Sequence, residues 1–156
     1  LESADPAILQ AMRKDMTSEQ FIRQTRLLHK AGLPVRTSLV FGYPQETPET
    51  IARTFDVCIE CGIYPSSGFL LPQPGTPIYD YAREQGLIGD EEEYLLSLGD
   101  RQDLRLNLTT MSDEELIAQV MAGARRCNDA LGLGLSGETL IKTGVYRGDQ
   151  KAQRSA

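Results

Sequence analysis

The spacing of apolar residues along the first half of the chain predicts short strands set between amphipathic helices. Ile8, Leu9 and Met12 fall on one face of a first helix. A second helix begins after Thr17, which is followed at capping-box spacing by Gln20. In a capping box, each side chain accepts a hydrogen bond from a free backbone N–H at the helix start.

The middle of the chain predicts a strand, a helix, a second strand and a further helix. Residues 33–41 are apolar and β-branched toward their end, which is typical of a buried parallel strand. A helix capped by Thr47 then runs to about Cys61, and residues 67–71 form the second strand. Thr76 begins the last helix. Two parallel strands joined through a helix make a β-α-β unit with a right-handed crossover.

After residue 89 the pattern changes and helices predominate. The acidic run at 90–93 opens a short helix with a solvated first turn. Residues 101–110 alternate apolar and polar side chains, which predicts an extended segment. Ser112 and Glu115 have the spacing of a second capping box. We expect the inward face of the helix that follows to consist of Leu116, Ile117, Val120, Met121 and Ala124.

The length of 156 residues fits one domain or a piece of one. Two strands alone leave both edges of a parallel sheet unpaired, which is a liability for an isolated domain. The chain also begins at Leu1, without Met or a signal peptide. We therefore expect a piece of a longer α/β protein, divided into 1–88, 89–148 and a flexible tail at 149–156. The isolated piece is expected to self-associate through its open strand edge.

Composition narrows the class of protein. Hydrophobic residues make up 40% of the chain and charged residues 24%, which excludes a disordered or collagen-like chain. No stretch reaches the roughly 20 apolar residues of a membrane-spanning helix. The net charge is −6, and a chain this acidic is poorly suited to neutralising nucleic-acid phosphates. We expect neither nucleic acid nor a membrane as a partner.

The three cysteines are Cys58, Cys61 and Cys127, an odd and irregularly spaced set. Such a set argues against a secreted disulfide framework, and with no targeting segment it indicates a cytoplasmic protein. Cys58 and Cys61 form a C-x-x-C pair, but Cys58 continues the helical spacing of Ile51 and Phe55. Core packing is the favoured interpretation of the pair. A metal or redox site is the alternative, and zinc would need further ligands.

No self-sufficient catalytic motif is found in the chain. The single histidine, His29, lies near the C-terminal end of the second helix, where a partly exposed imidazole interacts favourably with the helix dipole. No glycine-rich phosphate loop follows a strand. Ligands of parallel sheets bind at the carboxyl ends of the strands. Residues 41–47 and 70–77 follow the two strands and are dense in Gly and Pro.

Polar side chains also fall on one face of the first strand. Arg36 and Ser38 share this face with Val40, because alternate residues of a strand point to the same side. A cation and a hydroxyl on an inner face suit an anionic or zwitterionic ligand. The other interpretation is that Arg36 lies at the start of the strand and reaches solvent.

These strand ends resemble the second half of a radical S-adenosylmethionine (SAM) barrel. The strongest part runs from Val40 to Thr47, where the family has a glycine at the position of Gln45. Residues 71–79 match a Pro-x-Pro-Gly-Thr-Pro stretch, and residues 1–3 are similar to the end of a Gly-x-Glu-Ser motif. The resemblance covers the chain to about residue 88. It is closest to the branch with an N-terminal cobalamin-binding domain, which includes anaerobic magnesium-protoporphyrin monomethyl ester cyclases and several methylases.

The resemblance implies a partial (β/α) barrel that holds the fifth and sixth strands, followed by a mostly α C-terminal extension. It also implies SAM as a cofactor and a [4Fe–4S] cluster that reduces it, so that a 5′-deoxyadenosyl radical attacks a small-molecule substrate. The family holds the cluster with three thiolates in a C-x-x-x-C-x-x-C loop that this sequence lacks. The cluster ligands and any cobalamin domain therefore fall outside the chain, and the chain alone is expected to be inactive, with no catalytic residue or metal ligand.

By position in the family, the resemblance implies SAM contacts at Glu2, Ser3, Arg36, Ser38, Val40, Gly42 and Leu71. Glu2 and Ser3 would lie near the ribose or amino group of SAM. Arg36 and Ser38 would face the SAM carboxylate or the substrate. Val40 and Gly42 would lie on the strand that packs against adenine. Leu71 would offer backbone hydrogen bonds to adenine. Glu46 is expected to be structural, by capping the following helix.

Two other functions stay open. The chain could be a non-catalytic module that binds SAM or a partner protein, or a small independent α/β domain. Within the radical SAM interpretation, ring cyclisation, methylation and methylthiolation share this half of the barrel.

Overall fold

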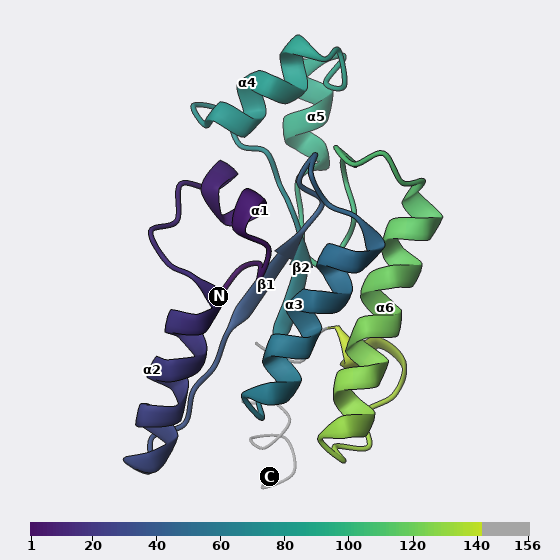
Figure 1. Cartoon of the computed structure of the whole chain (residues 1–156). Helices are drawn as coiled ribbons and strands as arrows, with labels where there is room; N and C mark the ends of the chain where they lie inside the picture. Colours follow the sequence, from purple (N-terminus) through teal and green to yellow (C-terminus); the bar gives the residue numbers. More distant parts are fainter. Residues whose placement is uncertain (142–156) are drawn as a thin grey trace, which may run out of the picture.

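The computed structural model describes residues 1–141 (Figure 1). The predicted tail at 149–156 and the end of the predicted extension, 142–148, lie outside the described residues. Within 1–141, no helix is long and apolar enough to cross a membrane. In chain order the elements are α1 (Pro6–Ala11), α2 (Ser18–Lys30), β1 (Ser38–Phe41), α3 (Pro48–Glu60), β2 (Ser66–Phe69), α4 (Pro77–Glu84), α5 (Glu91–Ser97), α6 (Asp113–Ala130) and the short 3-10 helix η1 (Gly137–Leu140).

The two strands form a parallel pair joined through α3, which confirms the predicted α/β class and the β-α-β unit. Ser38 lies opposite Ser66 in the register. β1 is shorter than the strand predicted over 33–41. Its predicted first half includes Pro34, which has no N–H to donate to a neighbouring strand, and most of this segment is exposed.

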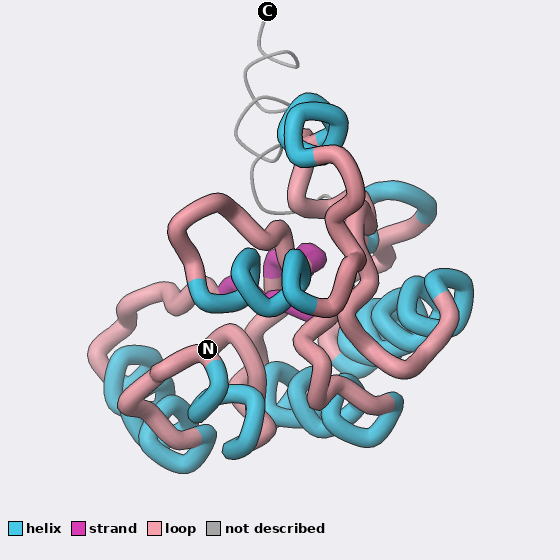
Figure 2. The backbone as a smooth tube through the Cα atoms, turned by 90° about the horizontal axis from the view of Figure 1, so that it is seen from above, coloured by secondary structure: helices cyan, strands magenta, loops and turns pink. Residues whose placement is uncertain are grey.

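One face of the strands is covered by α3 and α6, which pack against each other (Figures 1 and 2). Leu39 and Phe41 are buried in this core together with Phe55 of α3. The rings of Phe41 and Phe55 stack with 5.4 Å between their centroids and 19° between their planes. This contact joins the end of β1 directly to the helix that follows it.

Gly123 of α6 allows α3 and α6 to approach closely. A Cβ atom at Gly123 would lie 2.1 Å from Cδ2 of Phe55, far inside van der Waals contact. The missing side chain of Gly123 is therefore the space that the Phe55 ring fills, as close packing of a protein interior requires.

Other segments of the chain partly cover the outer edges of the strand pair. On the β1 edge, the Val40 N–H donates to the carbonyl of Glu2 at 3.0 Å. On the β2 edge, the Phe69 N–H donates to the carbonyl of Arg101 at 2.6 Å. The Arg101 side chain then lies against Gly68, and its Nη2 donates to Ser66 Oγ at 2.7 Å. The predicted extended segment at 101–110 forms no strand, but its first residue occupies this edge.

The helix starts follow the predicted caps. Thr17 and Gln20 form the capping box before α2, and Thr47 caps α3. Ser112 caps α6 by accepting from the Glu115 N–H at 3.1 Å, which is one half of the capping box predicted there.

The predicted inward face of α6 is wrong at Ile117 and only partly correct at Met121. Ile117 is 41% exposed, and Met121 is only partly buried. The buried stripe instead includes Leu116, Val120 and Gly123. The stripe is narrow because α6 packs mainly on α3, so the next residue around the helix faces outward.

A buried carboxylate shapes the loop after β1. Glu46 accepts hydrogen bonds from the Gly42 N–H at 3.1 Å and from the Thr50 hydroxyl at 3.0 Å. Burial raises the pKa of Glu46 to about 7, although these hydrogen bonds favour the charged form. The role of Glu46 is therefore structural, as expected, but it holds the loop to Gly42 while Thr47 caps α3.

Replacing Gly123 by Ala is expected to destabilise the fold by about 1–3 kcal/mol, because the new methyl group forces Phe55 to move. Gly89→Ala is the matched control, since a Cβ at Gly89 meets no atom within 4 Å. Urea unfolding followed by circular dichroism measures both variants. Equal stability of the two variants would contradict the close packing of α3 on α6.

Replacing Glu46 by Gln is expected to change how stability depends on pH. The pKa of Glu46 is raised from 4.5 to about 7 in the folded state, so folding takes up a proton between these values. The wild type therefore loses about 3 kcal/mol from this group as the pH rises from 4.5 to 7, and Glu46→Gln does not.

The matched control for this experiment is Glu49→Gln in the first turn of α3. Backbone N–H groups and the Thr47 side chain lower the pKa of Glu49, so its charge stabilises the fold above pH 4.5 and this contribution is lost as the pH falls. The free energy of unfolding of each variant is compared with that of the wild type at pH 5 and at pH 8. Relative to the wild type, Glu46→Gln gains stability at the higher pH, whereas Glu49→Gln changes little, because both pH values lie above 4.5, where the charge of Glu49 already stabilises the fold. Parallel behaviour of the two variants refutes the assignment.

Candidate functional site

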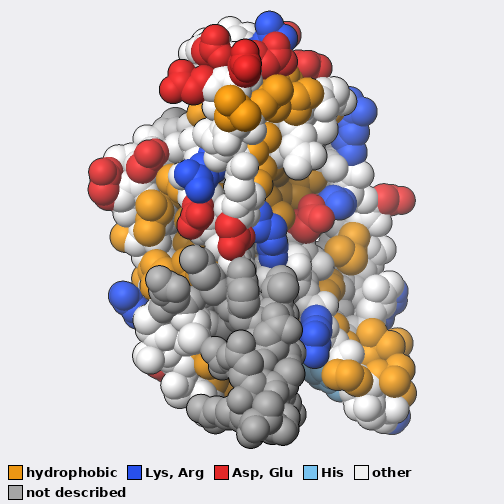
Figure 3. Space-filling model, turned by 180° about the vertical axis from the view of Figure 1, so that it is seen from behind, with side chains coloured by type: hydrophobic (Ala, Val, Ile, Leu, Met, Phe, Trp, Pro, Cys, Tyr) orange, Lys and Arg blue, Asp and Glu red, His pale blue; other side chains and the backbone are white. Residues whose placement is uncertain are grey.

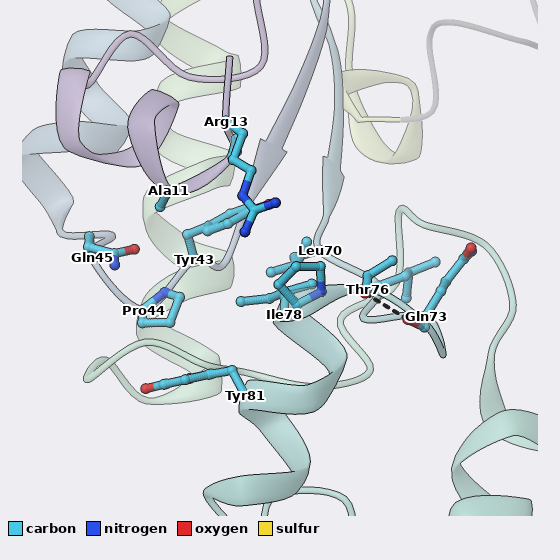
Figure 4. Close-up of a pocket in the computed structure, with 13 residues that line it drawn as sticks. Ala11, Arg13, Tyr43, Pro44, Gln45, Leu70, Gln73, Thr76, Ile78 and Tyr81 are labelled. Atoms are coloured by element: carbon cyan, nitrogen blue, oxygen red, sulfur yellow. Dashed lines mark hydrogen bonds between the residues drawn. The ribbon is translucent and has the colours of Figure 1, made fainter. Parts of the chain in front are cut away.

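A cavity opens at the carboxyl ends of the two strands, where sequence patterns place ligand binding. It has a volume of about 510 Å³ and lies between the end of α1, the loop after β1, the end of β2 and the start of α4 (Figure 4). Its wall is mostly apolar and aromatic, from Tyr43, Pro44, Leu70, Leu71 and Ile78. An apolar cavity with a few polar groups at its border is the usual form of a small-molecule site.

The turn after β2 holds one side of this cavity in place. The Tyr94 hydroxyl of α5 donates to the carbonyl of Pro72 at 2.7 Å, and the Thr76 hydroxyl donates to the carbonyl of Gln73 at 2.7 Å. Thr76 also caps α4. The prolines of this turn restrict the backbone further, so the wall at Gln73 is set before any ligand arrives.

Tyr43 forms the opposite wall and carries a polar end. Its side chain is half-buried, and burial, with a smaller contribution from the charge of Glu2, raises the pKa of its hydroxyl. The hydroxyl therefore stays protonated at neutral pH. Among residues 1–141 it has no hydrogen-bond partner, so it is available to a ligand.

Three of the predicted SAM contacts lie together at this end of the strands. Leu71 lines the cavity, and Val40 packs in the same apolar cluster as Leu70 and Tyr43. Gly42 directly precedes Tyr43 and has a φ of 108°, which only glycine adopts without strain. The backbone of Gly42 thus turns Tyr43 into the wall of the cavity.

Glu2 and Ser3 make contacts within the chain. The carboxylate of Glu2 pairs with the ammonium of Lys14 at 3.0 Å. Ser3 is buried, and its hydroxyl accepts from the Asp5 N–H at 3.2 Å. Both residues lie outside the cavity wall, although the Glu2 backbone bonds to Val40 and so places this segment beside β1.

Arg36 and Ser38 are exposed and also lie outside the cavity wall. Burial alternates along the strand, with Thr37, Leu39 and Phe41 inside, so Arg36 and Ser38 share the less buried face with Val40, as predicted. Arg36 precedes the first residue of β1. The structure therefore places this pair on the predicted face but toward the amino end of the strand.

Sequence reasoning missed Arg13, Tyr43, Gln73 and Tyr81 as parts of the cavity. Tyr43 and Gln73 stand inside the two Gly- and Pro-rich stretches, so their place after the strands was a usable signal. Arg13 comes from the end of α1, and only the tertiary structure brings it beside Tyr43 (Figure 4).

The cysteines form part of the core. Cys58, Cys61 and Cys127 are all buried and free, which confirms the favoured interpretation of packing. Burial raises the pKa of Cys58 to about 12 and that of Cys127 to about 11, so both remain thiols at neutral pH. Residues 1–141 contain no group of three His, Cys, Asp or Glu side chains placed to hold a metal ion.

The sequence is similar to several known enzymes, whereas no family model matches it. It is 33% identical over 89 residues to an uncharacterized methyltransferase of Pyrococcus horikoshii, covering 56% of this chain and 19% of that protein. It is 28% identical over 161 aligned positions to the tRNA-2-methylthio-N(6)-dimethylallyladenosine synthase of Bifidobacterium adolescentis, covering 98% of this chain and 33% of that protein. The synthase of the same name from Corynebacterium diphtheriae is 29% identical over 132 residues, covering 80% of this chain and 25% of that protein.

The chain thus spans about a fifth to a third of the length of the curated relatives it matches. The two synthases are tRNA methylthiotransferases, and their similarity extends over the segments that form the strand ends and most of the later helices. These similarities relate the chain to radical SAM enzymes.

Proposed function

We propose that this chain forms the SAM-binding wall of a longer radical SAM enzyme. The observation that carries the proposal is the cavity at the carboxyl ends of β1 and β2, because both stretches that resemble the family meet there. In this proposal the adenosine part of SAM lies in the cavity, with its base against the apolar and aromatic wall.

The backbone of Leu71 supports an adenine site. Leu71 follows the last ladder bond between the strands, in which the Leu70 N–H donates to the carbonyl of Phe41 at 2.8 Å. Among residues 1–141, the N–H and C=O of Leu71 have no hydrogen-bond partner. Partly buried backbone groups are normally paired, and the donor and acceptor edge of adenine would satisfy both.

The cluster that reduces SAM must be held outside this chain. Cys58, Cys61 and Cys127 are buried thiols of the α3–α6 core and do not fit thiolate ligation of an iron–sulfur cluster. When bound, the cluster supplies the electron that cleaves SAM. The residues of this chain bind and orient the adenosyl group and exclude water from it.

The similarity to the two synthases supports methylthiolation or methylation as the reaction of the longer enzyme. The motifs at the strand ends resemble instead those of cobalamin-dependent methylases and tetrapyrrole cyclases. A cobalamin domain, if the enzyme uses one, also lies outside this chain. We place the enzyme in the cytoplasm.

The negative surface charge of the chain is unfavourable for contact with the phosphates of a nucleic acid. Acidic side chains gather over α4 and α5, at the top of the molecule in Figure 3, and residues 90–93 of this patch are exposed. Such a patch repels phosphates. If the substrate is an RNA, its backbone is therefore held by other parts of the enzyme, and this chain binds only the small groups that enter the cavity.

The proposal is tested with the longer protein that contains this chain, reconstituted anaerobically with iron and sulfide. It is expected to bind SAM and to release 5′-deoxyadenosine after reduction. Replacing Tyr43 by Ala is expected to weaken SAM binding about tenfold, because it removes an aromatic wall of the site. Leu96→Ala, at an exposed position of α5, is the matched control and leaves SAM binding unchanged.

Two results would refute the proposal. One is an intact cluster with no 5′-deoxyadenosine, which would favour a non-catalytic module. The other is unchanged SAM affinity in Tyr43→Ala, which would place SAM elsewhere. Iron–sulfur absorbance at four irons per molecule of this chain alone would overturn the placement of the cluster.

A further inference from the structure

Arg13 has a left-handed backbone conformation, which other helices of this chain have at their ends only in a glycine. Its φ is 55°, and among residues 1–141 it is the only residue other than glycine with a positive φ. The Arg13 N–H donates to the carbonyl of Gln10 at 2.9 Å, and the Lys14 N–H donates to the carbonyl of Leu9 at 2.9 Å. This pair of bonds closes the end of α1 in a motif that normally has glycine at the position of Arg13.

Four other helix ends provide an internal comparison. The ends of α2, α3, α4 and α6 have the same two backbone hydrogen bonds, and each has a glycine at the matching position: Gly32, Gly62, Gly86 and Gly132. The left-handed conformation strains a residue that has a Cβ atom, whereas glycine adopts it freely. Among the five ends, α1 alone bears this strain, which indicates that the Arg13 side chain has a use.

The side chain of Arg13 reaches into the cavity. In Figure 4 it extends from the end of α1 to the ring of Tyr43, on the side that faces Leu70. Among residues 1–141 its guanidinium forms no hydrogen bond and no ion pair. The carboxylate of Glu2, whose charge acts on Tyr43, is paired with Lys14. The cavity thus has an apolar and aromatic wall and, at its border, the exposed Arg13, whose guanidinium forms no ion pair among residues 1–141.

We propose that Arg13 makes this cavity selective for a planar ring ligand that carries an anionic group, either a phosphate or a carboxylate. The ring lies against Tyr43 and Leu70, and the guanidinium donates two parallel hydrogen bonds to two oxygens of the anion. The inference rests on the proposed function in one respect, because the ring is expected to lie against the same wall as the adenosine part of SAM. The selectivity for charge depends on Arg13 alone.

The test compares three probes that share one ring: adenosine, AMP and adenosine-5′-carboxylic acid. Calorimetric titration into the full 156-residue chain is expected to show about tenfold tighter binding of at least one anionic probe than of adenosine. A preference for AMP identifies phosphate as the anion, and a preference for the acid identifies carboxylate. The preference is expected to weaken as salt is added.

The decisive variant is Arg13→Gly. It removes the guanidinium but relieves the backbone, so its melting temperature is expected to equal or exceed that of the wild type while the anion preference disappears. Arg13→Lys keeps the charge without the fork and retains part of the preference. Arg125→Ala removes an exposed arginine of α6 and is the matched control, with the preference unchanged.

Three outcomes overturn the inference: equal affinity for all three probes, no binding of any probe, or an anion preference that survives in Arg13→Gly. The proposed function fails separately. If the longer protein neither binds nor cleaves SAM while the Arg13-dependent preference persists, the cavity recognises an anion but belongs to another activity.

Discussion

The contact of Phe55 with Gly123 on one side and Phe41 on the other is the constraint on which the site depends. α6 approaches α3 only because Gly123 leaves room for the Phe55 ring. That ring in turn stacks on Phe41, the last residue of β1. Phe41 directly precedes the Gly42 turn and Tyr43, so the position of one cavity wall follows from the packing of two helices on the far side of the strands. A shift of α6 would thus be transmitted to the site through these two contacts and the backbone from Phe41 to Tyr43.

The second wall is fixed by different means. The turn after β2 contains prolines and is held by the hydroxyls of Tyr94 and Thr76, so it depends on α5 and on the cap of α4 rather than on the α3–α6 core. The two walls are therefore held in place by different elements, although Tyr43 and Leu70 pack in one apolar cluster. This arrangement leaves backbone groups at Leu71 unpaired within residues 1–141, and it leaves an opening between two independently supported surfaces. A ligand that bridges the walls would stabilise their relative position.

Local signals predicted much of the fold because the physics there is local. The caps at Thr17 and Thr47 need only a side chain and the next turn of backbone. The extent of β1 could not be read in the same way, since a strand exists only where a neighbour pairs with it, and residues 33–36 have none in the described part of the chain. Ile117 was misplaced for a related reason: its exposure depends on which elements cover α6.

The site was predicted in part. The Gly- and Pro-rich stretches located its two walls, and Leu71, Val40 and Gly42 lie there. Arg13 could not be found, because neither its left-handed backbone nor its approach to Tyr43 is encoded in nearby residues. The same holds for Arg101, whose side chain crosses the face of β2 from a segment more than thirty residues later.

The most direct test of the central claim is an NMR titration of SAM into the isotope-labelled chain, read at individual backbone amides. Shifts are expected to be concentrated at the amides that follow the carboxyl ends of the two strands, namely Gly42, Tyr43, Leu71 and Gln73, whereas the amides along α2 stay unchanged. Shifts confined to α2 or α5, or none at saturating SAM, would contradict the assignment of the cavity as the SAM-binding wall.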